Sequence, residues 1–179
     1  MEVKRSVKIF ETDRLTVNSF THKDKEYFIE LLSDSEIIDA IPQPKLDDEK
    51  ILEKFYFNLG LNGRPIKGQE NIYGIFEKDN PNMIGLCALL TNDENDWKLA
   101  YRLRQKYWKK GYGTETTKGL IDYCFSMLEI DKVTADVNIE NIASLKILNK
   151  FMTPEVDFFN SEDNCTDRRY TIEKSNWLP

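Results

Sequence analysis

The chain is poor in histidine and cysteine, the residues that most often bind zinc or act as paired nucleophiles. Its 179 residues include one histidine, His22, and three widely spaced cysteines, Cys87, Cys124 and Cys165. A zinc site or a Cys–His pair needs such groups close together, so neither is expected, and no metal is predicted. The odd count predicts reduced thiols, with Cys87 and Cys124 in the core. We expect His22 on the surface near a helix start.

Long apolar runs and an excess of positive charge are also lacking. No uninterrupted apolar run approaches the ~20 residues that cross a bilayer, and the stretch 1–7 has no apolar signal core. The net charge of −6 argues against nucleic acid or an anionic membrane as the main partner. We therefore expect a soluble, cytoplasmic protein, monomeric or homodimeric, folded as one domain over residues 1–179.

One short segment reverses the acidic balance. Residues 101–118 contain one acid, Glu115, and six basic residues, namely Arg102, Arg104, Lys106, Lys109, Lys110 and Lys118. Within this segment, the residues Trp108-Lys109-Lys110-Gly111-Tyr112-Gly113-Thr114-Glu115 form a glycine loop that leads into a predicted helix. Glycine lets backbone amides approach a ligand, and the first helical turn has unpaired N–H groups, so this loop suits a pyrophosphate. The alternative is a tight strand-to-helix turn with solvated lysines.

The glycine spacing narrows the possible ligands. A Walker loop, Gly-x4-Gly-Lys-[Ser/Thr], is absent, and the dinucleotide pattern G-x-G-x-x-G fails because position 116 is threonine. Nucleoside triphosphates and nicotinamide cofactors are therefore disfavoured.

The hydrophobic patterns around the loop predict an α+β domain on one mixed sheet. Helices are expected over 23–32, 47–59, 114–128 and 143–151, and strands over 14–20, 71–77, 83–90, 97–103, 132–138, 156–159 and 169–173. The strands at 71–103 form an antiparallel meander, and the helix at 114–128 permits a parallel crossover to 132–138. The loops 41–44 and 60–65 could border a substrate cleft.

A second polar group follows the strand at 132–138. Asn141 is a natural helix N-cap, and Ser144 lies three residues later. Capping alone would explain Asn141. Together with the glycine loop, however, it gives two helix N-termini after two strands that could be neighbours, with a gap for a ligand at their ends.

These stretches resemble the GNAT superfamily of N-acetyltransferases, in particular the branch that acetylates the N-termini of ribosomal proteins. The matching residues are Glu11-Thr12-Asp13-Arg14-Leu15, Tyr101-Arg102-Leu103, the glycine loop, and Asn141-x-x-Ser144 before Lys150. The resemblance implies a mostly antiparallel twisted sheet of six to seven strands flanked by about four helices. It also implies acetyl-CoA as donor and a primary amine as acceptor, either a peptide N-terminus or a small molecule.

The resemblance further implies roles for individual residues. Backbone amides of Lys109, Lys110, Gly111, Tyr112, Gly113 and Thr114 would hold the pyrophosphate, with the two lysines adding charge. The strand at Arg102, Leu103 and Arg104 would bind the pantetheine arm beside a bulge, with an N–H acting as oxyanion donor. Asn141 would hydrogen-bond the arm. Ser144 would lie near the sulfur as general acid or thiolate stabiliser, and the amine would attack the thioester directly.

Three departures from the family pattern concern the acid–base chemistry and the C-terminal third. Lys98 stands where relatives often carry an acid, which leaves the general base unassigned; Asp96 and Glu94 lie nearby but fit a turn. Lys150-Phe151-Met152 lacks the glycine usual after this helix, which predicts a different exit from it. Trp108 replaces the common glutamine or arginine, as it often does in this branch.

The lack of an assigned general base affects which amine the site can acetylate. At pH 7 only about 0.04% of a lysine side chain is neutral, against roughly 10–15% of an α-amine, so a site without a strong base favours the latter or a small amine of modest pKa. The alternative from another class is a GNAT-like module that binds acyl-CoA as a sensor or interaction domain without turnover. A plain α+β interaction domain is the third possibility.

Overall fold

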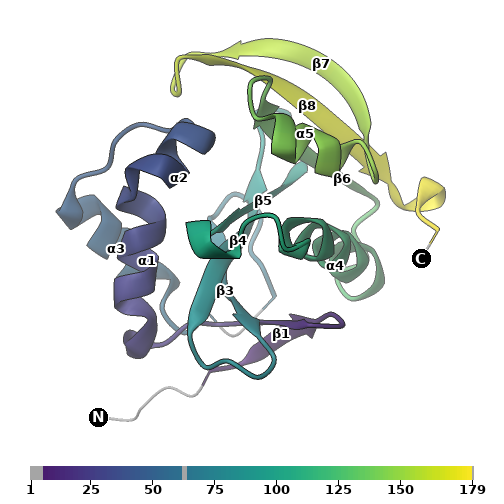
Figure 1. Ribbon diagram of the computed structural model, residues 1–179. Coiled ribbons are helices and arrows are strands. Elements are labelled where there is room, and N and C mark those ends of the chain that lie inside the picture. Colours follow the sequence, from purple (N-terminus) through teal and green to yellow (C-terminus); the bar gives the residue numbers. More distant parts are fainter. Residues whose placement is uncertain (1–5, 62–63, 179) are drawn as a thin grey trace.

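The computed structural model describes residues 6–61 and 64–178, which form one eight-stranded sheet in the order β1-β2-β3-β4-β5-β6-β8-β7 (Figure 1). Residues 1–5 of the predicted N-terminal stretch and residues 62–63 of the predicted loop 60–65 lie outside this description. The strands are β1 (Lys8–Glu11), β2 (Leu15–Asn18), β3 (Asn71–Glu77), β4 (Met83–Thr91), β5 (Trp97–Leu103), β6 (Lys132–Asn138), β7 (Thr153–Asn160) and β8 (Cys165–Glu173).

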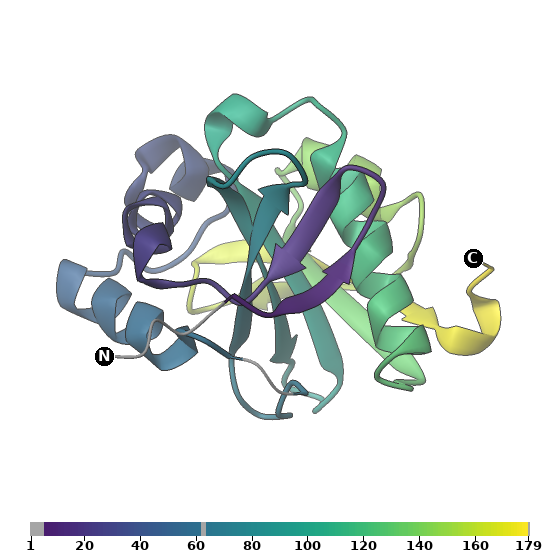
Figure 2. The same cartoon turned by 90° about the horizontal axis from the view of Figure 1, so that it is seen from below.

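Helices cover both faces of the sheet (Figure 2). One face carries α1 (Lys25–Ser33), α2 (Ser35–Ala40) and α3 (Asp48–Asn58), which bury Phe28, Ile37 and Phe55 against Phe76 and Leu86 of the sheet. The other face carries α4 (Tyr112–Ser126) and α5 (Ile142–Leu148), packed on a larger apolar core. Alternate residues of a strand point to opposite faces, so β5 presents one set of side chains to each helical layer.

The central prediction is confirmed. The meander is present as β3, β4 and β5, which pair antiparallel, and β5 pairs parallel with β6 after the α4 crossover. Within the described residues the counts are higher than predicted, with eight strands and five α-helices. The additional elements include β1 and α2, which contain four and six residues. Elements this short show too little periodicity to detect from sequence.

The C-terminal third pairs fully with the rest of the sheet. Seven residue pairs join β6 to β8, from Lys132↔Glu173 to Asn138↔Asp167, and β7 pairs with β8 as a hairpin. The predicted helix to Phe151 ends instead at Leu148. Its last carbonyl accepts N–H bonds from Phe151 and Met152 at 3.0 and 2.8 Å, and no residue from 149 to 152 has a positive φ. A right-handed turn thus replaces the left-handed glycine exit.

Candidate active site

The glycine loop begins α4 without a side-chain cap. Gly111 is the N-cap residue, with a left-handed φ of 81°, and Lys109 also has a positive φ of 60°. Among the described residues, no protein group accepts a hydrogen bond from the backbone amides of 109–114. Residues 109–111 are exposed and residues 112–114 are buried or half-buried, so this run of free donors at the start of a four-turn helix is accessible to an anion and suits one.

A clamp from the N-terminal hairpin fixes this loop. Thr12 Oγ1 and the Arg14 amide donate to Glu115 Oε1 at 2.6 and 2.8 Å, and Arg14 Nε donates to Glu115 Oε2 at 2.7 Å. The Arg14 guanidinium also donates to the Lys110 carbonyl at 3.1 Å and lies over the Tyr112 ring. The two stretches that carried the resemblance, 11–15 and 108–115, are therefore in direct contact.

We expect Glu115→Gln to loosen the loop and to destabilise the fold. Hydrogen bonds to charged groups contribute about 1.5–3 kcal/mol each, so a loss of roughly 2 kcal/mol in the free energy of unfolding at pH 7 is expected, with a higher KM for acetyl-CoA. Burial raises the pKa of Glu115, but the bonds from Thr12 and Arg14 outweigh it and the net pKa is lowered. The stabilisation is therefore present above the ordinary pKa near 4.5 and lost as the pH falls through the lowered value.

Urea unfolding of both proteins at several pH values checks this expectation. The difference between wild type and Glu115→Gln should shrink below pH 4.5, and Glu11→Gln, whose carboxylate is exposed beside Lys8, should unfold at nearly the same urea concentration as wild type. A difference that does not depend on pH would contradict the role of the Glu115 charge.

The strands β5 and β6 separate soon after they begin. Their parallel pairing covers only Trp97↔Val133 and Lys98↔Thr134. The bulge expected in this strand is not present in its pairing with β4, where the register runs without a shift from Gly85↔Leu103 to Thr91↔Trp97. The opening arises instead from β6, which turns away to pair with β8 along its whole length.

The hydrogen bonds between β4 and β5 determine which peptide groups of β5 face this opening. The Arg104 N–H donates to the Ile84 carbonyl at 2.9 Å, so the even-numbered residues of β5 direct their peptide groups towards β4. By alternation, the peptide groups of Leu99, Tyr101 and Leu103 point towards β6, and the Leu103 carbonyl accepts a bond from the Trp108 indole at 2.8 Å. Free amides at the open edge thus belong to the odd-numbered residues.

A cavity of about 350 Å³, here the loop cavity, lies between the glycine loop, β5 and the start of α5. Eight of the predicted site residues line it, namely Arg102, Leu103, Lys109, Gly111, Gly113, Thr114, Asn141 and Ser144. Arg104, Lys110 and Tyr112 do not line it. Most of the residues predicted from two distant parts of the sequence are therefore brought together around one space.

The two arginines of the predicted strand are held by other groups. Arg104 is buried, donates to Glu30 Oε1 at 2.9 Å and stacks over the Tyr27 ring. The guanidinium of Arg102 donates to the Leu31 carbonyl at 3.0 Å and to Gln43 Oε1 at 2.7 Å, and burial lowers its pKa to about 10. Both side chains therefore join the sheet to α1 and the loop after α2.

Asn141 makes the capping contact that sequence alone could explain. Its Oδ1 accepts a bond from the Ser144 amide at 3.0 Å, while its Nδ2 donates to the Ala40 carbonyl at 2.8 Å. The side-chain amide of Asn141 thus caps α5 and also binds the end of α2, beside the opening between β5 and β6. Nδ2 carries a second hydrogen, for which no acceptor is found among the described residues.

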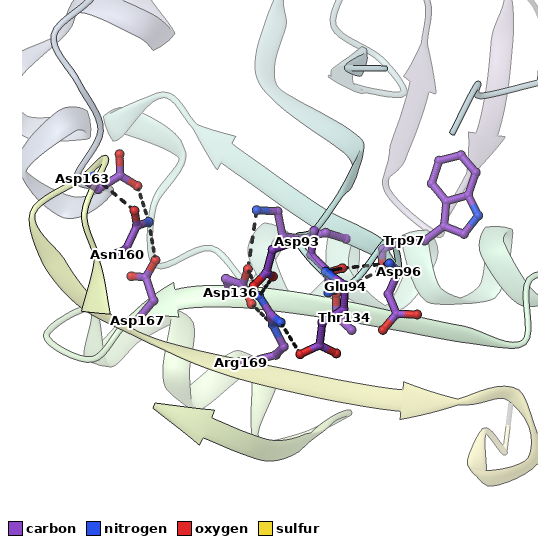
Figure 3. A network of polar contacts seen from close by, with 12 residues as sticks. Asp93, Glu94, Asp96, Trp97, Thr134, Asp136, Asn160, Asp163, Asp167 and Arg169 are labelled. Atoms are coloured by element: carbon purple, nitrogen blue, oxygen red, sulfur yellow. Dashed lines mark hydrogen bonds and ion pairs between the residues drawn. The ribbon is translucent and has the colours of Figure 1, made fainter. Parts of the chain in front are cut away.

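A second space of about 370 Å³, here the acidic cavity, lies beside the loop cavity, between β5, β6 and the β7–β8 turn, and shares six lining residues with it. Its lining includes four carboxylates, Glu70, Asp136, Asp163 and Asp167. Glu70 pairs with Lys54 at 2.6 Å, outside the cavity lining. Asp163 and Asp167 both accept bonds from Asn160 Nδ2 at 2.9 Å, and among the described residues neither forms an ion pair (Figure 3).

Asp136 is held by two cations. Its carboxylate accepts from Arg169 Nε at 2.8 Å (Figure 3). It also lies 3.5 Å from Lys98 Nζ. The side chain of Arg169 is only 4% exposed and also binds Asp93 and Glu94. Lys98, at the position where relatives often carry an acid, thus faces an acid from the neighbouring strand. Sequence reasoning missed Asp136 because the parallel pairing, not chain proximity, places it there.

The acids considered earlier as possible bases lie in the turn before β5. Asp96 pairs with Lys132 at 2.8 Å and Glu94 with Arg169 at 3.0 Å, and neither lines either cavity. Both therefore act as turn residues. Within residues 6–61 and 64–178, no group of three or more histidine, cysteine or acidic residues could hold a metal ion, and no helix is long and apolar enough to span a bilayer.

The sheet that opens between β5 and β6, with a helix N-terminus at the opening, defines an acyltransferase fold of the GNAT type. Residues 14–151 match the acetyltransferase (GNAT) domain, so the chain belongs to the GNAT acetyltransferases, enzymes that use acetyl-CoA. The chain is 28% identical over 141 residues to the N-acetyltransferase p20 of Bacillus licheniformis, covering 77% of this chain and 78% of that protein.

Solved structures agree on the fold. The spermidine N-acetyltransferase of Vibrio cholerae, in complex with CoA and spermine, has a TM-score of 0.74 at 18% identity, covering 93% of this chain and 99% of that one. RimL, a ribosomal L7/L12 α-N-protein acetyltransferase in complex with CoA, has a TM-score of 0.72 at 15% identity, covering 94% and 98%. The two neighbours take different acceptors, so the fold does not select one.

Proposed function

We propose that the chain, acting as one domain over residues 1–179, moves an acetyl group from acetyl-CoA in the loop cavity directly to a primary amine in the acidic cavity. The observation that carries this proposal is that the two cavities adjoin one another and share Tyr101, Asn141 and Ser144 in their linings. A donor and an acceptor placed in adjoining spaces can react without a covalent enzyme intermediate.

For the donor, the proposal assigns the pyrophosphate to the free amides of 109–114. Lys109 and Lys110, both exposed, add positive charge there. The pantetheine arm then follows the open edge of β5, where the amides of Tyr101 and Leu103 are the candidate donors to the thioester carbonyl. Asn141 Nδ2 can donate to the arm, and Ser144 lies at the sulfur end.

For the acceptor, the charge of the acidic cavity favours a cationic amine. Burial and the neighbouring charge of Asp167 raise the pKa of Asp163, and the more distant charge of Lys98, which pairs with Asp136, offsets this only in part. Arg102 also lines the cavity, but it binds neutral oxygens towards α1. The second ammonium group of a diamine would pair with the carboxylates of Asp163 and Asp167.

The reacting amine itself should have a modest pKa. Asp96 and Glu94 are held in ion pairs away from both cavities, so neither stands in for the acid missing at Lys98, and the general base stays unassigned. A peptide α-amine, as in the ribosomal-protein branch, or a small-molecule amine is thus favoured over a lysine side chain. Among small molecules, the acidic cavity favours diamines.

An amine panel, monitored by release of free CoA thiol, tests this proposal. It contains a monoamine, a diamine, and matched peptides with a free α-amine or a free ε-amine. We expect thiol release with the diamine or the α-amine peptide, and faster reaction of the α-amine than of the ε-amine. Asp163→Asn should raise KM for the diamine about 10-fold, because it removes one of the two charges facing the second ammonium, and should change KM for the monoamine much less.

Asp157→Asn is the matched control, since this aspartate lies on β7 in an exposed pair with Arg168 and lines neither cavity. Faster lysine acetylation would contradict the preference for a modest pKa. Binding of acetyl-CoA without thiol release for every amine would favour the sensor module instead.

A further inference from the structure

Few side chains stand where the two cavities meet. The residues that line both are Ala40, Ile41, Tyr101, Arg102, Asn141 and Ser144. Arg102 and Asn141 are already bound to protein groups, and a guanidinium does not give up its proton in proteins. Tyr101 and Ser144 are therefore the two members of this set with a hydroxyl proton to offer.

The hydroxyl of Tyr101 lies against the start of α4. A β-carbon placed on Gly113 would come within 2.8 Å of Tyr101 Oη, so only glycine leaves room for it. One turn later, Thr117 donates to the Gly113 carbonyl at 2.8 Å and stands beside the same hydroxyl. Tyr101 thus reaches from β5 across the opening to the first turn of the helix that carries the glycine loop.

The surroundings of this hydroxyl favour its protonated form. Burial raises the pKa of Tyr101, and hydrogen bonds with the Ser144 and Thr117 hydroxyls offset only part of that rise. A phenol with an ordinary pKa of about 10 is close to the value of about 8.5 for a thiol, whereas a serine hydroxyl does not titrate in the accessible range. A phenol is consequently the better matched proton donor to a thiolate.

We propose that Tyr101 protonates the sulfur of departing CoA and that Ser144 positions it, an inference that rests on the placement of acetyl-CoA proposed above. The neutral amine forms the C–N bond with the thioester carbon, and the C–S bond breaks with its electron pair passing to sulfur. The Tyr101 hydroxyl gives its proton to that sulfur. The phenolate then takes the excess proton from the acylated nitrogen, so the products are the amide, CoA thiol and neutral tyrosine.

Steady-state kinetics and calorimetry of Tyr101→Phe test the inference. We expect kcat to fall about 100-fold, while the Kd for acetyl-CoA changes less than about 3-fold, since the ring remains in place. Ser144→Ala should lower kcat about 10-fold or less, and the double variant should be no worse than Tyr101→Phe alone, because both changes act on one proton transfer.

Tyr73→Phe is the control, because Tyr73 and Tyr101 both pair with Cys87 across β3, β4 and β5, and Tyr73 is buried and lines neither cavity. A kcat for Tyr101→Phe within 3-fold of wild type would overturn the inference. So would a larger loss for Ser144→Ala than for Tyr101→Phe, or a parallel loss of acetyl-CoA affinity, which indicates a structural role. If calorimetry shows that wild type binds acetyl-CoA elsewhere or not at all, the proposed function itself is wrong. This result is distinct from a failure of the Tyr101 inference, which is measured by kcat.

Discussion

Gly113→Ala is expected to lower kcat/KM for acetyl-CoA by about 100-fold. The added β-carbon would lie 2.8 Å from Tyr101 Oη and 3.0 Å from Ile147 Cδ1, both on the wall of the loop cavity. To relieve these contacts, the Tyr101 ring and the end of the Ile147 side chain must shift within the loop cavity, and displacements of about 1 Å at a reacting centre cost roughly this factor. The rate of CoA thiol release at varied acetyl-CoA concentration measures the effect.

Gly68→Ala is the matched control for this variant. Gly68 has a left-handed φ of 83°, nothing lies within 4 Å of its added β-carbon, and it lines neither cavity. It should lose stability through strain, of order 1 kcal/mol, yet keep kcat/KM. Equal kinetic losses in both variants would mean that Gly113 acts only through stability and not through the cavity.

Arg169→Leu is expected to destabilise the fold by about 3–5 kcal/mol. The guanidinium is 4% exposed and pairs with Asp93, Glu94 and Asp136 (Figure 3). Its removal leaves Asp136, whose side chain is 10% exposed, with Lys98 at 3.5 Å as its remaining cation. Loss of one partner from a buried ion pair has a cost of this size, because the other charge stays buried. Urea unfolding at pH 7 measures it.

The neighbouring residue supplies the control. Arg168 pairs with Asp157, but this pair is exposed, so Arg168→Ala should destabilise the fold far less than Arg169→Leu. If Arg169→Leu proved as mild as Arg168→Ala, the network would not hold Asp136 at the wall of the acidic cavity as described.

Much of the fold was predictable because its signals are local. The bounds of β3, β5 and β6 follow from apolar alternation between polar turns, and the predicted bounds agree with the structure residue for residue. The start of α4 was placed two residues late, at 114 rather than at Tyr112, because Gly111 serves as its N-cap. The hairpin of β7 and β8 was found only in part, since its residues are largely polar and exposed along β7.

The candidate site was predictable only where chemistry and spacing coincide. Gly111, Gly113 and Asn141 stand at helix starts, which sequence can locate, and all three line the loop cavity. Arg102 and Arg104 were both predicted to bind the arm, yet the register with β4 directs the peptide groups of both towards β4, and sequence alone does not give that register. Asp163 lies in the β7–β8 turn and reaches the acidic cavity only through the pairing of β6 with β8.

The most direct test of the loop assignment is calorimetric titration of the wild-type chain with acetyl-CoA, acetyl-dephospho-CoA and acetyl-pantetheine. If the amides of 109–114 hold the pyrophosphate, acetyl-dephospho-CoA should bind nearly as well as acetyl-CoA. Acetyl-pantetheine should bind at least about 100-fold more weakly, which corresponds to about 2.8 kcal/mol or two charge-assisted hydrogen bonds. Equal affinity for acetyl-pantetheine and acetyl-CoA would contradict the assignment.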